Sequence, residues 1–362
     1  MSYNELCKKC ILPKNYVSIE MDNSGVCNYC NNYTPINYLG EEKLKEKIDS
    51  ILKKYPYRKY DCVVGFSGGR DSTYLLWYIV KKLHLKPLAV FIDSGLIPEI
   101  TLKNIHNITK KLGVDLKIVN KNYLKRLFPI HFNAWIKRPK PETLVTFCVG
   151  CRLGVNKFVD EVTIKEKIPI VFYGDSPFEG HHYKSNIVKL NAKSKSKWSF
   201  ILGYIRQIIQ NPFLILNPYS LYIQISEFIV TNSQKQRRKR YNIEKISIFH
   251  KYIRWNEKEI EEVLEKELGW NRDSNLNTSY RTDCKIGIIR QYLYYKLLGY
   301  NDKDDHLSCL VADGQITREE ALERVVKERE VPKETLKSIC KESGIEYKKI
   351  EKLLEGLANS RR

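Results

Sequence analysis

The chain has 362 residues, with 62 Lys and Arg against 42 Asp and Glu, so its formal net charge is +20. Its 43% hydrophobic and 29% charged residues exclude a wholly disordered chain and predict one large domain or two smaller ones. No apolar stretch follows the charges of the first ten residues, and the apolar segment 207–226 is interrupted by prolines, asparagines and glutamines. These patterns argue against a secretory signal and a membrane span, and they favour a cytoplasmic protein.

The first pattern along the chain is a pair of CxxC motifs. Cys7 and Cys10 form one motif, Cys27 and Cys30 form the other, and sixteen residues separate them. This is the spacing of a zinc ribbon, and residues 22–25 supply the turn expected between its two short strands. Four protein thiolates leave no open coordination position, so we expect a structural zinc ion here.

Residues 61–73 carry the second pattern, a short apolar strand at 63–66, a Ser-Gly-Gly loop and a helix from residue 73 to 83. Such a loop lets backbone N–H groups approach an anion at the positive end of a helix. Four residues are expected to bind phosphate: Ser67, Gly68, Gly69 and Ser72. Phosphate would repel Asp71 unless Mg²⁺ lies between them, so the sequence predicts a magnesium–pyrophosphate site.

Further apolar strands at 87–93, 115–119 and 168–173, with a helix at 102–112, predict a parallel α/β sheet. Ligands bind at the carboxyl ends of such strands. Polar groups stand there in Asp93-Ser94-Gly95 and Gly174-Asp175-Ser176. We expect Asp93 near the nucleoside, Gly174 in contact with the nucleotide and Asp175 near Mg²⁺ or the reacting group, although either aspartate could instead cap a helix.

A third CxxC pair, Cys148 and Cys151, cannot complete a tetrahedral metal site alone. Cys284, within Thr-Asp-Cys-Lys, is the candidate third thiolate for a second metal or an iron–sulfur cluster. Two alternatives stay open, because the pair could be redox-active or the three cysteines could be unrelated core residues.

Residues 181–258 contain 15 Lys and Arg against 3 Asp and Glu, which gives +12 of the total charge. Three interpretations compete for this segment: a membrane-surface contact, an RNA contact and a helical cap with a solvated basic face. Helices are then expected at 256–268 and 286–298, after a capping box at 317–320, and through the charged tail at 332–357.

The Ser-Gly-Gly-Arg-Asp-Ser loop resembles the PP-loop of the ATP pyrophosphatase superfamily, whose members cleave ATP between the α and β phosphates. Many members have Lys where this chain has Arg70, another cation. The order of motifs resembles the bacterial N-acetyl sugar amidotransferase family, linked to pseudaminic acid, legionaminic acid and lipopolysaccharide O-antigen synthesis. The motifs are CKKC with CNYC, SGGRDST, FCVGC, YGDSP, TDCK and the stretch 304–322.

The resemblance implies a Rossmann-like, adenine nucleotide alpha-hydrolase-like α/β fold. It implies five parts: a zinc ribbon at 1–38, a PP-loop ATP-binding domain at 39–180, a basic insertion at 181–255, a continuation of the catalytic region at 256–325 and a helical tail at 326–362. It implies that ATP adenylates the N-acetyl oxygen of a nucleotide-activated sugar and that ammonia then forms an acetamidino group. Asp71 and Asp175 would hold Mg²⁺, and Lys285 or Arg70 would meet the charge that develops on pyrophosphate.

The chain shows no glutaminase pattern, so the resemblance implies a separate glutaminase with a barrel-type companion subunit. The competing interpretation is an ATP-dependent sulfurtransferase acting on tRNA or a small molecule. Some tRNA-thiolating PP-loop enzymes combine zinc ribbons with three cysteines that hold a [4Fe-4S] cluster, and Cys148, Cys151 and Cys284 resemble that arrangement. The high positive charge is compatible with RNA binding.

Overall fold

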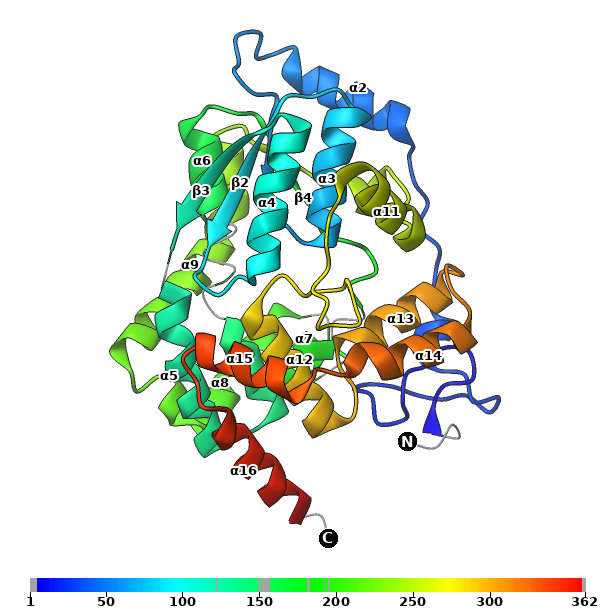
Figure 1. The fold of residues 1–362 in the computed structure, drawn as a ribbon, viewed down its shortest axis with the longest axis vertical. Helices are drawn as coiled ribbons and strands as arrows, with labels where there is room; N and C mark the ends of the chain where they lie inside the picture. The colour runs from blue at the N-terminus through cyan, green and yellow to red at the C-terminus, as the bar shows by residue number, and fades with distance from the viewer. Residues whose placement is uncertain are drawn as a thin grey trace.

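The computed structural model describes residues 5–121, 123–148, 151, 157–180, 183–191, 193–194 and 196–359. Its centre is a five-stranded sheet with the order β3-β2-β1-β4-β5, in which every neighbouring pair is parallel (Figure 1). The strands are β1 (Cys62–Gly65), β2 (Pro87–Asp93), β3 (Asp115–Asn120), β4 (Ile170–Tyr173) and β5 (Glu244–Ile246). This architecture confirms the predicted α/β class.

Helices cover both faces of the sheet. On one face lie α3 (Arg70–Lys81) and α4 (Glu99–Leu112), and on the other lies α6 (Val159–Lys165). Successive residues of a strand point to opposite faces. Val64 of β1 therefore joins the core that contains Leu75 of α3, while Val63 joins the core that contains Val159 of α6. This double burial explains why the central strands are almost continuously apolar.

The edge strand β5 was not anticipated from the sequence. Its three residues pair with β4 in the register Ile170↔Glu244, Val171↔Lys245 and Phe172↔Ile246. Two of the three side chains are charged and exposed, as suits the edge of a sheet. The strand lies inside the basic segment, so that segment completes the sheet.

Between β3 and β5 the chain forms mostly helices. These are α5 (Tyr123–Lys137), η2 (Pro141–Cys148), α7 (Tyr183–Val188), α8 (Lys197–Gln210), η4 (Pro212–Leu214) and α9 (Pro218–Arg240). Figure 1 shows α5, α8 and the lower part of α9 gathered at the lower left of the molecule. No helix among the described residues is both long enough and apolar enough to cross a membrane.

The remaining helices lie near the two ends of the chain. They are α1 (Asn28–Asn31), α2 (Glu41–Leu52), α10 (Ile248–Lys251), α11 (Glu257–Val263), the π-helical η5 (Leu264–Leu268), α12 (Lys285–Leu298), α13 (Asp302–Ala312), α14 (Arg318–Arg329), α15 (Lys333–Glu342) and α16 (Tyr347–Asn359). The helix expected at 256–268 thus ends in a π-helical turn. Thr317 caps α14 as expected, because its side chain accepts a hydrogen bond from Glu320 N.

Helices α12 to α15 gather below the carboxyl ends of the strands in Figure 1, beside the N-terminal residues. Side-chain bonds join these regions: Asn15 donates to Leu298 O, and Tyr16 Oη donates to Asp305 Oδ1 at 2.7 Å. The two ends of the chain therefore build one body at the edge of the sheet where a parallel α/β protein binds its ligands.

Candidate active site and metal centre

The phosphate loop lies between β1 and α3, as the sequence predicted. Gly68 has a φ of 76°, which L side chains rarely adopt, and a Cβ there would lie 2.5 Å from Ile105 Cγ1. The loop is also held from within: Ser67 Oγ lies 3.0 Å from Ser72 Oγ, and Gly69 N donates to Ser67 Oγ at 3.3 Å. The four predicted phosphate-binding residues form one compact turn at the start of α3.

The end of β4 packs directly against this turn. A Cβ on Gly174 would lie 2.5 Å from Ser72 Cα, so only glycine permits this approach of two backbones. The contact brings Asp175 beside the loop. Its Oδ1 is buried and has no hydrogen-bond partner among the described residues, and its Oδ2 lies 3.8 Å from His250 Nδ1. An orphaned carboxylate oxygen fits a divalent cation, which prefers oxygen ligands.

Two other predicted carboxylates are also near strand or helix ends. Asp71 is in the first turn of α3, and its Oδ1 accepts a hydrogen bond from Arg70 Nε at 2.9 Å. Asp93 is the last residue of β2 and accepts a hydrogen bond from Gly95 N at 2.8 Å, so its carboxylate closes the turn after that strand.

Arg70 is buried among carboxylates of the C-terminal region. Its Nη1 donates to Glu257 Oε1 at 2.7 Å and to Ser279 Oγ at 3.1 Å. Glu257 also accepts from Arg324 Nη1 at 2.7 Å, and His306 Nε2 lies 3.2 Å away. Burial opposes the ionised form of Glu257, yet the bond to His306 and the charge of Arg70 hold its pKa well below the ordinary value. This network ties the phosphate loop to α11, α13 and α14.

Replacing Glu257 by Gln is expected to destabilise the protein by about 3–5 kcal/mol, because two arginines would lose a buried counter-charge. Urea unfolding followed by circular dichroism would measure the change in the free energy of unfolding. Glu259→Gln is the matched control, since Glu259 is on the same helix and is exposed. Equal stability of the two variants would contradict a structural role for the network.

The sequence analysis missed two residues that touch the phosphate loop from far along the chain. Trp270 Nε1 donates to Gly68 O at 3.0 Å. Asp283 hydrogen-bonds Ser67, and a Cβ on Gly69 would lie 2.9 Å from Asp283 Oδ2. Burial raises the pKa of the Asp283 carboxyl. The Thr-Asp-Cys-Lys motif was noticed for its cysteine and lysine, whereas its aspartate makes the contact with the loop.

The third set of cysteines is near the same place. Cys284 precedes α12, and burial together with the neighbouring Cys148 raises the pKa of Cys284 to about 12. Cys148 Sγ accepts a hydrogen bond from Arg290 Nη1 at 2.6 Å, and Cys151 packs against the same apolar cluster. Among the described residues, these three sulfurs do not lie close enough together to share a single metal ion, and whether they hold an iron–sulfur cluster stays a prediction. Val149 and Gly150 lie outside the described residues.

Lys285 begins α12, and its backbone N–H donates to Leu96 O at 3.0 Å. Its ammonium group forms an ion pair with the half-exposed carboxylate of Glu342 on α15. The structure therefore brings Lys285 to the end of the loop that follows β2, next to Cys284.

The four N-terminal cysteines converge, as their spacing predicted. Their ligand atoms all lie within 4.8 Å of one another, and all four residues are buried. Cys10 Sγ and Cys27 Sγ are 3.8 Å apart, which is about the separation of two sulfurs in a tetrahedral site with Zn–S bonds of about 2.3 Å. The backbone N–H groups of Lys9 and Cys27 point to Cys7 Sγ at 3.4 and 3.2 Å, as suits a thiolate. The donor set fits a closed, structural zinc site.

This cysteine centre is attached to the C-terminal helices. Arg318 Nε, at the start of α14, donates to the carbonyl oxygens of Cys7 and Cys10 at 3.1 and 3.0 Å. The four cysteines also belong to the apolar cluster that includes Ile289 of α12. The cysteine centre therefore supports the same body that packs against the phosphate loop.

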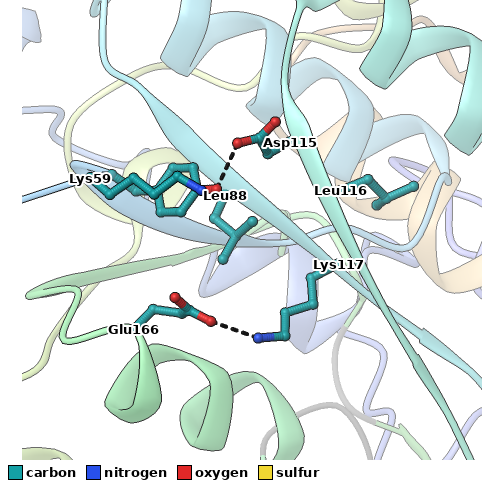
Figure 2. A pocket seen from close by; sticks show the side chains of 7 residues that line it. Lys59, Leu88, Asp115, Leu116, Lys117 and Glu166 are labelled. Atoms are coloured by element: carbon teal, nitrogen blue, oxygen red, sulfur yellow. Dashed lines mark hydrogen bonds and ion pairs between the residues drawn. The ribbon is translucent and has the colours of Figure 1, made fainter.

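A separate hollow of about 400 Å³ lies at the opposite edge of the sheet, where β2 and β3 begin (Figure 2). Its polar side chains already pair with each other: Tyr60 Oη donates to Asp115 Oδ2 at 2.6 Å, and Lys117 Nζ donates to Glu166 Oε1 at 2.7 Å (Figure 2). Ligands of parallel sheets bind at the other edge, so we do not place the active site here.

The fold and the site define a parallel α/β protein with a glycine-rich loop at the carboxyl ends of its strands. The C-terminal part is more specific: residues 274–362 match the family model described as the C-terminal domain of WbpG-like lipopolysaccharide (LPS) biosynthesis proteins. Asp283 and Cys284 lie within the matched residues.

Two curated relatives come from Methanocaldococcus jannaschii. The uncharacterized protein MJ1599 is 38% identical over 84 residues, which is 23% of this chain and 30% of that protein. The uncharacterized protein MJ0066 is 36% identical over 72 residues, which is 20% of this chain and 15% of that protein. The matched stretches therefore span less than a third of either relative.

Similar solved structures include the U34-tRNA thiolase NcsA of Methanococcus maripaludis with its [4Fe-4S] cluster, at 16% identity and a TM-score of 0.34, covering 88% of both chains. They also include the NH3-dependent NAD synthetase of Campylobacter jejuni, at 15% identity and a TM-score of 0.26. That match covers 55% of this chain and 86% of the synthetase.

Proposed function

We propose that the chain is an ATP-dependent amidotransferase of the PP-loop type that acts in lipopolysaccharide biosynthesis. Its reaction would convert the N-acetyl group of a nucleotide-activated sugar into an acetamidino group. One observation carries this proposal: Asp283, inside the WbpG-like domain, lies against Ser67 and Gly69 of the phosphate loop. The loop therefore contacts the WbpG-like domain, and the proposal has ATP and the sugar meet beside this contact.

The proposed reaction has two steps. The amide oxygen attacks the α-phosphorus of ATP, the bond to the β-phosphate breaks, and pyrophosphate leaves. Ammonia then attacks the activated carbon, and AMP leaves with the former amide oxygen while nitrogen takes its place. Adenylation is needed because an amide is a poor electrophile, and the site must align the amide oxygen with the α-phosphate and exclude water.

The described residues support a division of roles. Ser67, Gly68, Gly69 and Ser72 would bind the phosphates through N–H and hydroxyl groups, with Asp93 and Gly174 near the nucleoside. Asp71 and Asp175 would hold Mg²⁺, which would neutralise the phosphates. Arg70 would act by orienting Asp71, since its guanidinium is engaged by carboxylates. Lys285 would leave Glu342 to meet pyrophosphate.

Ammonia would come from a partner glutaminase with a barrel-type companion subunit, and zinc would occupy the N-terminal cysteine centre. Free ammonium can replace such a partner in a test. The sugar carries the groups that the reaction changes, so the chemistry can be followed on the sugar itself.

The test incubates the protein with ATP, Mg²⁺, ¹⁵N-ammonium and a UDP-N-acetyl sugar labelled with ¹⁸O in its acetyl group. We expect AMP that carries the ¹⁸O and a sugar that carries the ¹⁵N, detected by mass spectrometry. AMP without ¹⁸O would show that the amide is not adenylated and would contradict the proposal. Sulfur entering tRNA or the sugar from sulfide, with no ¹⁵N transfer, would favour the sulfurtransferase.

A further inference from the structure

Helix α8 presents an apolar stripe to solvent. Trp198, Leu202, Ile205 and Ile209 are between 46% and 72% exposed. Their spacings of four, three and four residues keep them on one face of a helix. The opposite face is fixed against the protein, because a Cβ on Gly203 would lie 1.9 Å from Val188 O. The stripe therefore cannot turn inward, and no described residue covers it.

Helix α9 lies beside α8, since Tyr204 Oη of α8 donates to Gln224 Oε1 of α9 at 2.7 Å, and it also exposes apolar and cationic side chains. Tyr222, Ile225 and Ile229 in its first half are at least half exposed. Lys239 and Arg240 follow Leu221 and Tyr222 by eighteen residues, which is about five turns of an α-helix, so they lie on the same face. Neither cation has an ion-pair partner among the described residues. One face of α9 thus changes from apolar to cationic along its length.

The adjacent segments of the same chain add to this positive charge. No Asp or Glu stands between Glu179 and Glu227 in the sequence. Arg206 is exposed on α8, and it has no ion pair within the described part of the chain. On α5, Lys137 lies over the Phe213 ring at 4.2 Å and Arg126 over the Tyr219 ring at 5.2 Å. Both cations are exposed, and they lie over aromatic rings of η4 and α9.

We propose that the exposed faces of α8 and α9 form a peripheral docking surface for an anionic lipid bilayer. The apolar stripe would enter the boundary between headgroups and acyl chains, and Arg206, Lys239 and Arg240 would meet lipid phosphates. A second copy of this chain would bring like charge to the surface, and a nucleic-acid backbone would leave the apolar stripe in water. An anionic membrane surface accepts both features. This inference is independent of the reaction.

Trp198 supplies an internal probe. The chain has five tryptophans, of which Trp77, Trp135 and Trp255 are buried and Trp270 is half-buried, while Trp198 is 71% exposed. The full-length protein is mixed with vesicles of phosphatidylglycerol and phosphatidylcholine in equal parts, or of phosphatidylcholine alone. We expect flotation and a blue shift of tryptophan emission with the anionic vesicles only. Trp198→Phe should abolish the shift.

Two double variants separate the apolar and ionic parts. Trp198→Ser with Ile209→Ser should weaken vesicle partitioning about tenfold or more. Lys239→Ser with Arg240→Ser should weaken partitioning about 30-fold, because each Lys or Arg near an anionic surface adds a favourable free energy of binding and two are removed. The controls are Tyr57→Ser with Val326→Ser, and Lys53→Ser with Lys54→Ser, all exposed and outside the surface. The melting temperature of each variant shows that it is folded.

Several results would overturn the proposal. These are absence of flotation, equal binding to neutral vesicles, and partitioning by either double variant that equals its control. A concentration-dependent dimer that dissociates in the Trp198→Ser, Ile209→Ser variant would assign the surface to a second copy instead.

Discussion

The Cys27→Ser variant is expected to lose one equivalent of zinc per chain and to melt well below the unmodified protein. Structural zinc sites contribute about 10–16 kcal/mol of apparent binding free energy in small domains. Here the cysteine centre is hydrogen-bonded to α14 through Arg318 and packs with α12. Loss of the metal should therefore also destabilise the C-terminal helices. We expect a loss of more than about 4 kcal/mol and a fall in Tm of at least roughly 5 °C.

Zinc content by plasma mass spectrometry and Tm by calorimetry would check this result. Cys340→Ser is the matched control, because Cys340 is a buried thiol of the same apolar cluster and is outside the cysteine centre. The control should retain its zinc, with only a modest change in Tm from repacking. A Cys27→Ser protein that kept both zinc and Tm would show that the four cysteines do not form a metal site.

The second large effect concerns catalysis. Asp71→Asn should lower the rate of AMP and pyrophosphate formation by about 10²–10³-fold, as for loss of one electrostatic contact in a transition state. The amide keeps the shape of the side chain but carries no charge to hold Mg²⁺ against phosphate. The measurement is the initial rate of pyrophosphate release at saturating ATP and Mg²⁺.

Asp71 also accepts a hydrogen bond from Arg70, so a structural effect must be separated from a catalytic one. Glu257→Gln disturbs Arg70 without changing Asp71 and is the comparison variant. If Asp71 holds Mg²⁺, its variant should lose far more activity than Glu257→Gln when both are assayed under conditions where they remain folded. Equal losses would mean that Asp71 acts only by positioning the loop.

Patterns within a short stretch of sequence predicted most of the local structure. The apolar runs at 63–66 and 87–93 gave strands with nearly the same bounds, because strands buried on both faces need continuous apolar residues. The two CxxC pairs predicted a cysteine centre, since their spacing is itself a geometric constraint. The loop at 67–69 was predicted because a Ser-Gly-Gly run between an apolar strand and a helix is a local sequence pattern.

Contacts between distant segments could not be predicted in this way. Arg70 hydrogen-bonds Glu257, and Gly68 hydrogen-bonds Trp270, although roughly two hundred residues separate the partners. The periodicity of a short segment cannot predict such pairs. Strand β5 was missed because an edge strand of Glu-Lys-Ile has no apolar run. Its strand conformation is decided by pairing with β4, so tertiary context outweighs local propensity.

The pairing of β4 with β5 has a consequence for how this chain can diversify. The excursion between them, residues 174–243, leaves the carboxyl end of β4 and re-enters at the amino end of β5, on the neighbouring strand about 4.8 Å away. Chain entropy penalises a longer closed loop only logarithmically, by about 0.6 kcal/mol for each doubling of its length. Between the residues that anchor it, such as Lys184 on Asp302, Ser220 on His131 and Arg238 on Asp160, the excursion can therefore change its length and its surface with little strain on the sheet. Its outer helices are the part of the molecule that is most free to acquire new attachments while the reaction centre stays unchanged.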